Sequence, residues 1–289
     1  MEVALERTPA RRTGPSPRRR GAPAGLAVGA VAALVLLCAT PARGRVESSP
    51  FEVSLARDLT ILAAGATLWA GIGGVASELP ASVTCNPCDR AGVNAMDRPV
   101  VNYHSAGARR ASDLLVAALP TLAVGGFFFD LGRWGWRGVA EDVLLAAQAM
   151  ALTGAVQQLT ALAVRRPRPF MYRGDTDERR DNADANMSFF SGHTASAFAA
   201  AVSFATIFTL RRPHSRFRAV VWVASLLIAS AVPLCRVAAG KHFWSDVLAG
   251  AAVGTSVGIL VPLLHRRPRW SEGVQLSASA TGIGLVGQF

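Results

Sequence analysis

The stretch CRVAAGKHFWSD, residues 235–246, places an arginine, a lysine, a histidine and an aspartate between two apolar runs. His242 and Asp246 are four residues apart, so at the start of a helix their side chains share one face. A carboxylate there can accept the proton of one imidazole nitrogen and leave the other nitrogen free to attack. We therefore predict that His242 is a nucleophile and that Asp246 orients it.

Two arginines could bind the group that such a nucleophile attacks. Arg168 lies in RRPRP, residues 165–169, and Arg236 follows Cys235. A guanidinium is planar, always charged and matched to the oxygens of a phosphate. The pair therefore predicts a phosphate-binding site.

A third cluster, SFFSGHT at residues 188–194, directly precedes an apolar run. The free backbone N–H groups of a helix start favour an anion, which places Ser191 and Gly192 among the predicted phosphate-binding residues. His193 could then donate a proton to a departing alkoxide, which is the role of a general acid.

The elements that must position these residues are apolar segments close to the roughly 20 residues that a membrane-spanning helix needs. Six such segments occur, at 59–77, 114–129, 143–164, 193–210, 219–234 and 245–264. Consecutive spans form hairpins, so the three clusters fall on one membrane face. The sequence predicts an all-α, polytopic membrane bundle of about six helices.

Composition agrees with a membrane protein that acts on an anion. The chain of 289 residues is 51% hydrophobic and has a formal net charge of +11. Its arginines stand in short clusters between apolar segments instead of forming one continuous surface. This pattern favours membrane lipids and a phosphate substrate as partners and disfavours nucleic acid, while the oligomeric state stays open.

The two ends of the chain lie outside this predicted bundle. Residues 1–42 read as a basic start followed by a signal peptide cleaved after Ala42, or as an extra, uncleaved helix. The tail, 265–289, alternates small or polar with apolar residues as a strand does, although we expect it to be frayed.

Two further features do not require a catalytic role. Cys85 and Cys88 are spaced for a local disulfide on the oxidising side of the membrane, or are two inert thiols, and no second pair suggests a metal site. The acidic loop at 174–186 matches no calcium loop and is expected to be a solvated lid.

The motifs RPRP, FFSGHT and CR followed by five residues, His, three residues and Asp resemble the three signatures of the type 2 phosphatidic acid phosphatase (PAP2) and vanadium haloperoxidase superfamily. The resemblance covers roughly residues 161–246, and the helical pattern extends this domain to 59–264. It implies a phosphohistidine-forming nucleophile at His242, with Asp246 as its partner and His193 as the acid. The implied phosphate cradle is Arg168, Ser191, Gly192 and Arg236.

By this resemblance the chain is a hydrolase that removes phosphate from a lipid and needs no metal ion or other cofactor. One alternative is a vanadate-dependent haloperoxidase, but those enzymes are typically soluble. Another is a non-catalytic phospholipid binder or transporter, which would not need both a nucleophile and an acid.

The chain departs from the family pattern at Ala161, where the first motif normally has a lysine seven residues before its arginine. One phosphate-binding cation is therefore missing. Arg165, one helical turn along, or Arg166 could replace it, or the site could be weakened.

The distribution of arginines sets the expected orientation. The loop 211–218 carries four arginines and no acid, and RRPR follows the last apolar segment, so both are expected in the cytoplasm. The active site then faces outward, in what we expect to be a bacterial inner membrane. Six spans would put residues 44–58 in the cytoplasm, which conflicts with a cleaved signal peptide, so either the cleavage or the span at 59–77 is in question.

Overall fold

The chain forms a helical bundle in the computed structural model, which describes residues 48–78, 85, 87–173, 185–267, 274–279 and 282–287. The long helices of this part are α2 (Leu55–Glu78), α3 (Ala106–Phe127), α4 (Leu131–Val164), α6 (Gly192–Arg211), α7 (Arg218–Ala238) and α8 (Trp244–Leu264). Single 3₁₀ turns are η1 (Arg90–Gly92), η2 (Arg98–Asn102), η3 (Phe128–Asp130) and η4 (Pro169–Tyr172). Each predicted apolar segment falls on one of the long helices, which confirms the helical fold class.

By length and composition, the described residues contain five candidate membrane spans. One of them, Ala106–Tyr172, is 67 residues long and includes both α3 and α4, because η3 joins the two helices directly. The count of five spans and the presence of six long helices in the described part of the chain are therefore compatible. Residues 1–42 lie outside the described residues.

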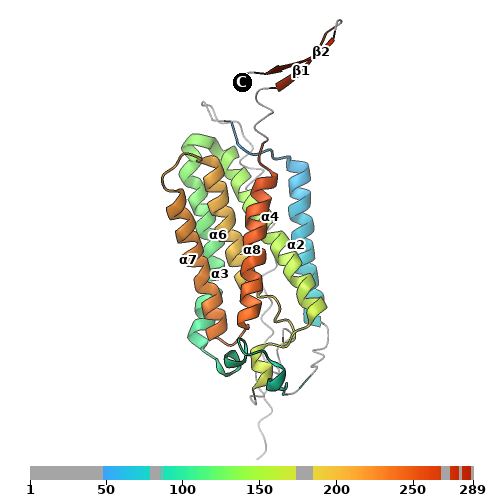
Figure 1. Cartoon of the computed structure of the whole chain (residues 1–289), viewed down its shortest axis with the longest axis vertical. Coiled ribbons are helices and arrows are strands. Elements are labelled where there is room, and N and C mark those ends of the chain that lie inside the picture. Colours follow the sequence, from blue (N-terminus) through green and yellow to red (C-terminus); the bar gives the residue numbers. More distant parts are fainter. Residues whose placement is uncertain are drawn as a thin grey trace, which may run out of the picture.

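Successive helices run in opposite directions along the bundle (Figure 1). The end of α4, the start of α6, the end of α7 and the start of α8 consequently meet at one end, together with η1, η2 and η4. The backbone joins two of the clusters directly, since the N–H of Ser191 donates to the carbonyl of Asp246 over 3.1 Å. The prediction that the three polar clusters share one end is confirmed.

Three glycines let α8 approach α6 closely enough for backbone contact. A Cβ atom on Gly254 would lie 2.2 Å from the carbonyl oxygen of Ala195, and one on Gly250 would lie 2.7 Å from that of Ser191. Gly258 is similarly close to α6, at 3.1 Å from the carbonyl oxygen of Ala199. Small residues at four-residue spacing are a common means of packing helices tightly in a membrane. This contact sets the distance between the two helices that carry the histidine motifs.

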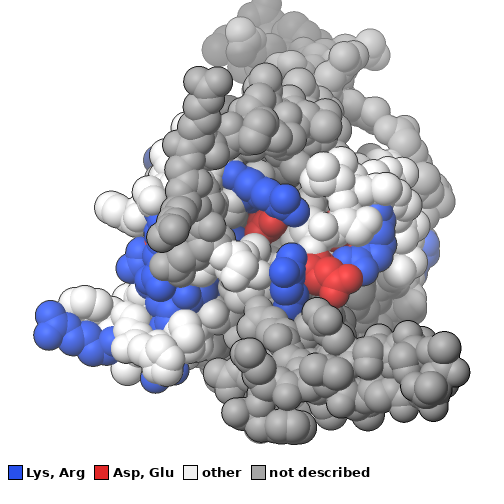
Figure 2. Space-filling model, turned by 90° about the horizontal axis from the view of Figure 1, so that it is seen from above, with Lys and Arg blue, Asp and Glu red and all other residues white. Residues whose placement is uncertain are grey.

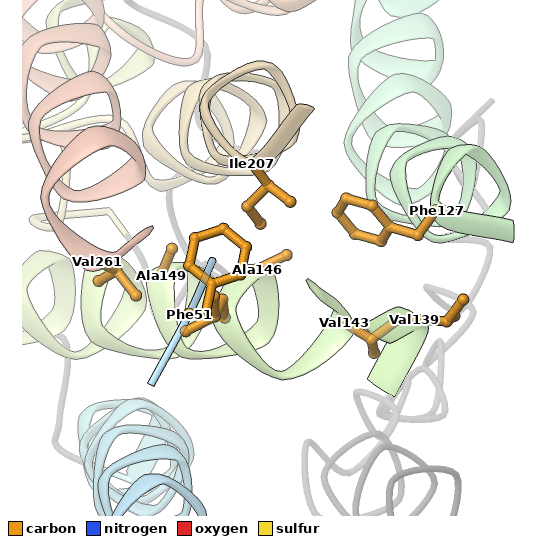
Figure 3. Packing of buried hydrophobic residues seen from close by; sticks show 9 residues of the cluster. Phe51, Phe127, Val139, Val143, Ala146, Ala149, Ile207 and Val261 are labelled. Carbon is orange, nitrogen blue, oxygen red and sulfur yellow. The ribbon is translucent and has the colours of Figure 1, made fainter. Parts of the chain in front are cut away.

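Apolar residues fill the bundle toward the end opposite the polar clusters (Figure 3). Phe51, which precedes α2, points in among residues of α4, α6 and α8, including Ala149, Ile207 and Val261. Phe51 is 1% exposed, and its backbone pairs with that of Arg266 beyond α8. The segment before α2 is therefore held at the same end of the bundle as the end of α8.

Two of the four arginines between α6 and α7 form ion pairs within the bundle. Arg211 is buried, and its Nε lies 2.7 Å from Oδ1 of Asp142 while its Nη2 lies 3.2 Å from Oε2 of Glu141. Arg212 pairs with Asp130. A guanidinium is well suited to such buried pairing because its fork meets two carboxylates at once.

The remaining arginines at this end are exposed, among the residues that the structure describes. Figure 2 looks down on it and shows more Lys and Arg than Asp and Glu among the described side chains. The exposed arginines are Arg57, Arg133, Arg137, Arg216, Arg218, Arg266 and Arg267. The end opposite the polar clusters thus carries a basic rim.

The described part of the C-terminal tail forms two strands, contrary to our expectation that the tail is frayed. Strands β1 (Val274–Ser279) and β2 (Gly282–Gly287) pair antiparallel, with Val274 opposite Gly287. The alternation of small and apolar residues is the signal of these strands. The hairpin lies beyond the basic rim (Figure 1), away from the polar clusters.

Candidate active site

A cavity of about 370 Å³ opens among the polar clusters. Arg168, Gly192, His193 and His242 line it, so four of the predicted site residues share one space. The other lining residues include Trp69 from α2 and further side chains of α3 and α4, which give the cavity an apolar side. A phosphate on an apolar carrier is the kind of ligand that this combination suits.

His242 is 2% exposed and has one defined hydrogen bond. Its Nδ1 lies 2.8 Å from the backbone carbonyl oxygen of Ser188. Since a carbonyl can only accept, Nδ1 carries the proton and Nε2 keeps its lone pair. Burial lowers the pKa of His242 to about 3, with a further contribution from the charge of Arg168. The imidazole is therefore neutral and usable as a nucleophile at ordinary pH.

Asp246 does not accept the proton of His242, and here our prediction was wrong in detail. The two groups are 3.8 Å apart, beyond hydrogen-bond distance. Asp246 Oδ2 instead accepts from the Ser188 hydroxyl over 2.5 Å and from the N–H of Phe243 over 2.9 Å. Oδ1 accepts from Arg166 over 2.6 Å. These donors occupy both oxygens of the buried carboxylate. Asp246 therefore orients His242 indirectly, because it holds Ser188, whose carbonyl oxygen accepts the hydrogen bond from His242.

A second buried carboxylate, Asp97, extends this network and was not identified from the sequence. Nη2 of Arg166 lies 2.8 Å from Oδ2 of Asp97, and both the N–H and the hydroxyl of Ser245 donate to the same carboxylate. Burial alone would raise the pKa of Asp97, but the hydrogen bonds from Ser245 and Arg166 outweigh it and lower that pKa. Asp97 remains ionised and fixes Arg166 from the loop before η2.

His193 and Arg236 share one acidic partner, Asp113 of α3. Nε2 of His193 and Nη1 of Arg236 lie 3.0 Å and 3.1 Å from the same oxygen, Oδ1 of Asp113. Arg236 also donates to the hydroxyl of Ser112 over 3.3 Å. The predicted acid and one predicted phosphate ligand are therefore neighbours. Asp113 was missed, although an acid inside an apolar helix is itself a signal of function.

The remaining predicted phosphate ligands differ in position. Gly192 begins α6 and lines the cavity. Ser191 is fully buried and caps that helix, since its Oγ accepts from the N–H of Thr194 over 3.4 Å. Arg165 ends α4 in a left-handed conformation with φ of 49°. It is exposed and is not one of the residues that line the cavity.

Arg166 is not positioned as the replacement for the family lysine that Ala161 lacks. Its guanidinium binds Asp97 and Asp246 and lies 4.3 Å over the ring of Phe243. Ala161 itself is fully buried. The structure thus assigns Arg166 to holding the network in place.

Cys85 and Cys88 form the predicted disulfide. Next to it, the N–H of Cys88 donates to the carbonyl of Met171 over 3.1 Å, and Cys88 packs with Phe170 and Met171. The bridge therefore braces the segment that follows Arg168. The loop at 174–184 lies outside the described residues, so its expected role as a lid stays a prediction.

Comparisons with known proteins agree with this arrangement. The profile of the PAP2 superfamily matches residues 142–270, which contain all three motifs. A lipid A 1-phosphatase from Porphyromonas gingivalis is 35% identical over 149 residues, which are 50% of this chain and 28% of that relative. The chain thus spans less than a third of that relative's length.

Among solved structures, a transmembrane PAP2-type phosphatidylglycerolphosphate phosphatase from Bacillus subtilis is similar, with a TM-score of 0.44 and 20% identity. The alignment covers 72% of this chain and 94% of the other. The family profile spans the three motifs, and the structure brings the same motifs together around one cavity. Residues 142–270 therefore resemble the PAP2 superfamily, and the described part of the chain carries this region among five candidate membrane spans.

Proposed function

We propose that the chain is a membrane phosphatase that removes a phosphate group from a lipid through a phosphohistidine at His242. The observation that carries this proposal is the state of His242, a buried, neutral imidazole whose Nδ1–H is bound to the Ser188 carbonyl. This leaves Nε2 as the nitrogen that can attack, and the same imidazole lines the cavity beside Arg168 and His193. A site that only binds phosphate has no need of such a nucleophile.

The chemistry follows in two balanced steps. The lone pair of His242 Nε2 forms a bond to phosphorus, the bond from phosphorus to the lipid oxygen breaks, and that oxygen takes a proton from His193. Water, losing a proton to His193, then attacks the phosphohistidine. The N–P bond breaks, its electrons return to His242, and orthophosphate leaves. Arg168 and Arg236 stabilise the charge on the phosphoryl oxygens in both steps.

We also propose which lipids carry the phosphate. Candidates are phosphatidate, a polyprenyl diphosphate and a lipid A phosphate. The relative from Porphyromonas gingivalis is named a lipid A 1-phosphatase, which favours the last of these. The apolar cavity wall, with Trp69 and Met150, supports a lipid as the carrier of the phosphate.

We also propose that the site faces outward from a bacterial inner membrane. The exposed arginines at the opposite end, such as Arg216 and Arg266, favour a cytoplasmic location for that end. The disulfide lies at the site end, because Cys88 contacts Met171 close to Arg168, and an oxidising compartment suits it. Since residues 48–54 lie at the basic end, this orientation argues against export of that segment after cleavage at Ala42.

The decisive experiment measures orthophosphate release by the purified protein from a panel of lipid phosphates in detergent micelles. We expect turnover with at least one lipid and its loss in His242→Ala. A His193→Ala variant should accumulate an acid-labile phosphoryl group on the protein. Hydrolysis of the phosphohistidine is slowed in this variant, because no histidine takes the proton from the attacking water. Turnover that survives in His242→Ala would refute the mechanism.

A further inference from the structure

Asp113 joins three helices around the proposed acid. It is the one acidic residue of α3, and its Oδ1 contacts His193 of α6 and Arg236 of α7 at once. The distance from Oδ1 is 3.0 Å to Nε2 of His193 and 3.1 Å to Nη1 of Arg236. An ionisable side chain is expensive to keep in an apolar helix, so such a specific pair of contacts indicates a role in the site.

Of its two partners, His193 depends more on Asp113. Nη1 of Arg236 also donates to the hydroxyl of Ser112, a fully buried residue, over 3.3 Å. For the imidazole of His193, Asp113 is the one hydrogen-bond partner in the part of the chain that the structure describes. Loss of the carboxylate would therefore leave Arg236 a second contact but would release the imidazole.

Asp113 touches the acid from outside the space where a substrate would bind. His193 lines the cavity, whereas Asp113 is not one of the lining residues. Its carboxylate occupies Nε2 of the imidazole. In the proposed mechanism, Nδ1 is then the nitrogen that exchanges a proton with the substrate. Asp113 can act on the reaction only through the residues that it contacts.

A general acid must carry a proton before it can donate one. Two positive features next to His193 oppose the charged imidazole, namely the guanidinium of Arg236 and the amino-terminal end of α6, of which His193 is the second residue. The carboxylate of Asp113 acts in the opposite direction, because a negative charge at hydrogen-bond distance stabilises an imidazolium. Since this side chain is 50% exposed, water screens the effect and makes it moderate.

We propose that Asp113 is a positioning residue for the acid, which holds Nε2 of His193 and stabilises the imidazolium that donates a proton to the departing lipid oxygen. It also stabilises the imidazolium that forms when His193 takes a proton from the attacking water. Asp113 itself exchanges no proton in either step. This inference rests on the proposed phosphatase function and adds the group that maintains its acid.

The test separates proton donation from phosphate binding by a change of leaving group. Dodecyl phosphate releases an alcohol, which needs a proton, whereas a nitrophenyl phosphate with the same dodecyl chain releases a stable phenolate, which does not. In both cases kcat/KM reports the steps up to release of this group, before water attacks.

The variant Asp113→Asn keeps the shape of the side chain and removes its charge. We expect it to lower kcat/KM for dodecyl phosphate by about thirtyfold, less than the roughly 10²- to 10⁴-fold contribution of a complete general acid. The value for the nitrophenyl substrate should change little. Asp89→Asn removes an exposed carboxylate at the same end of the bundle and should alter neither value.

A double variant shows through which residue Asp113 acts. In a His193→Ala background, Asp113→Asn should cause no further loss on dodecyl phosphate. A further loss there, or equal losses on both substrates in the single variant, overturns the inference in favour of a role in phosphate binding or folding. A higher kcat/KM in Asp113→Asn also overturns it, because Asp113 would then compete with phosphate for Arg236. A wild type that releases neither alcohol nor phenolate overturns the phosphatase function itself.

Discussion

Arg166 joins two buried carboxylates, with Nη1 2.6 Å from Oδ1 of Asp246 and Nη2 2.8 Å from Oδ2 of Asp97. Both acids are fully buried, so the guanidinium neutralises charge that would otherwise be costly inside the protein. Through Asp246 and Ser188, this ion-pair network reaches the hydrogen bond that orients the nucleophile. Positioning of His242 therefore begins in a loop more than a hundred residues earlier in the chain.

A role in positioning predicts a specific kinetic signature for Arg166→Gln and Asp97→Asn. Both should lower kcat by about a hundredfold, the effect of a small misplacement of a reacting group, while KM changes little. Steady-state assays on one lipid phosphate provide the measurement, with Arg165→Gln as the neighbouring control. A rise in KM at constant kcat would instead identify Arg166 as a phosphate ligand.

The indirect connection of Asp246 to His242 predicts unequal losses in single-turnover experiments. His242→Ala removes the nucleophile and should reduce the rate by several orders of magnitude. Asp246→Asn keeps the Nδ1 hydrogen bond to the Ser188 carbonyl, so its loss should be smaller. Rapid-quench measurements of phosphate release would compare them, and equal losses would contradict this arrangement.

The lowered pKa of His242, about 3 against an ordinary 6.5, predicts activity that persists in acid. Protonation would remove the lone pair of Nε2, so the acidic limb of kcat/KM should lie well below pH 6.5. In Arg168→Gln the limb should move upward, because a charge that lowers this pKa is removed. The same shift makes folding less stable as the pH falls from 6.5 toward 3, since the unfolded chain binds a proton that the folded one does not. An acidic limb near pH 6.5 in the wild type would contradict the assignment.

The close packing of α6 and α8 predicts that Gly254→Ala destabilises the protein. The new methyl group would stand 2.2 Å from the carbonyl oxygen of Ala195, and such overpacking costs about 1–3 kcal/mol or more. Gly71→Ala is the matched control on α2, because no described atom lies within 4 Å of its Cβ position. Thermal denaturation in detergent should show a lower midpoint for Gly254→Ala alone. Equal midpoints for Gly254→Ala and Gly71→Ala would show that α6 and α8 can move apart to make room for the methyl group.

The proposed orientation predicts opposite labelling of the two ends in intact cells. In a background with Cys38 and Cys235 replaced by serine, His104→Cys at the site end should react with a membrane-impermeant maleimide. Ser215→Cys, in the turn between α6 and α7, should react only after the cells are opened. The reverse pattern would invert the topology.

The sequence alone was sufficient to bring His193, His242 and Arg168 together, because each motif adjoins a helix end and alternating helices return to the same face. It could not identify Asp97, Asp113 or the Ser188 carbonyl. Their importance depends on three-dimensional contacts between segments about 50 to 150 residues apart. The spacing of His242 and Asp246 correctly predicted a shared face, but spacing carries no information about competing donors. Arg166 and the N–H of Phe243 occupy the carboxylate that the imidazole would otherwise have bound.

The glycine contacts between α8 and α6 also determine which motions the enzyme can use. The backbones of α6 and α8 are in contact at Gly250 and Gly254, with no layer of side chains between them, so the two helices move together as one rigid unit. His193 lies at the start of α6 and His242 lies just before α8, so this rigid unit carries both the acid and the nucleophile. We expect a widening that admits a lipid to involve the other helices that line the cavity, which are α2, α3 and α4. The distance between His193 and His242 then stays constant while the helices across the cavity move.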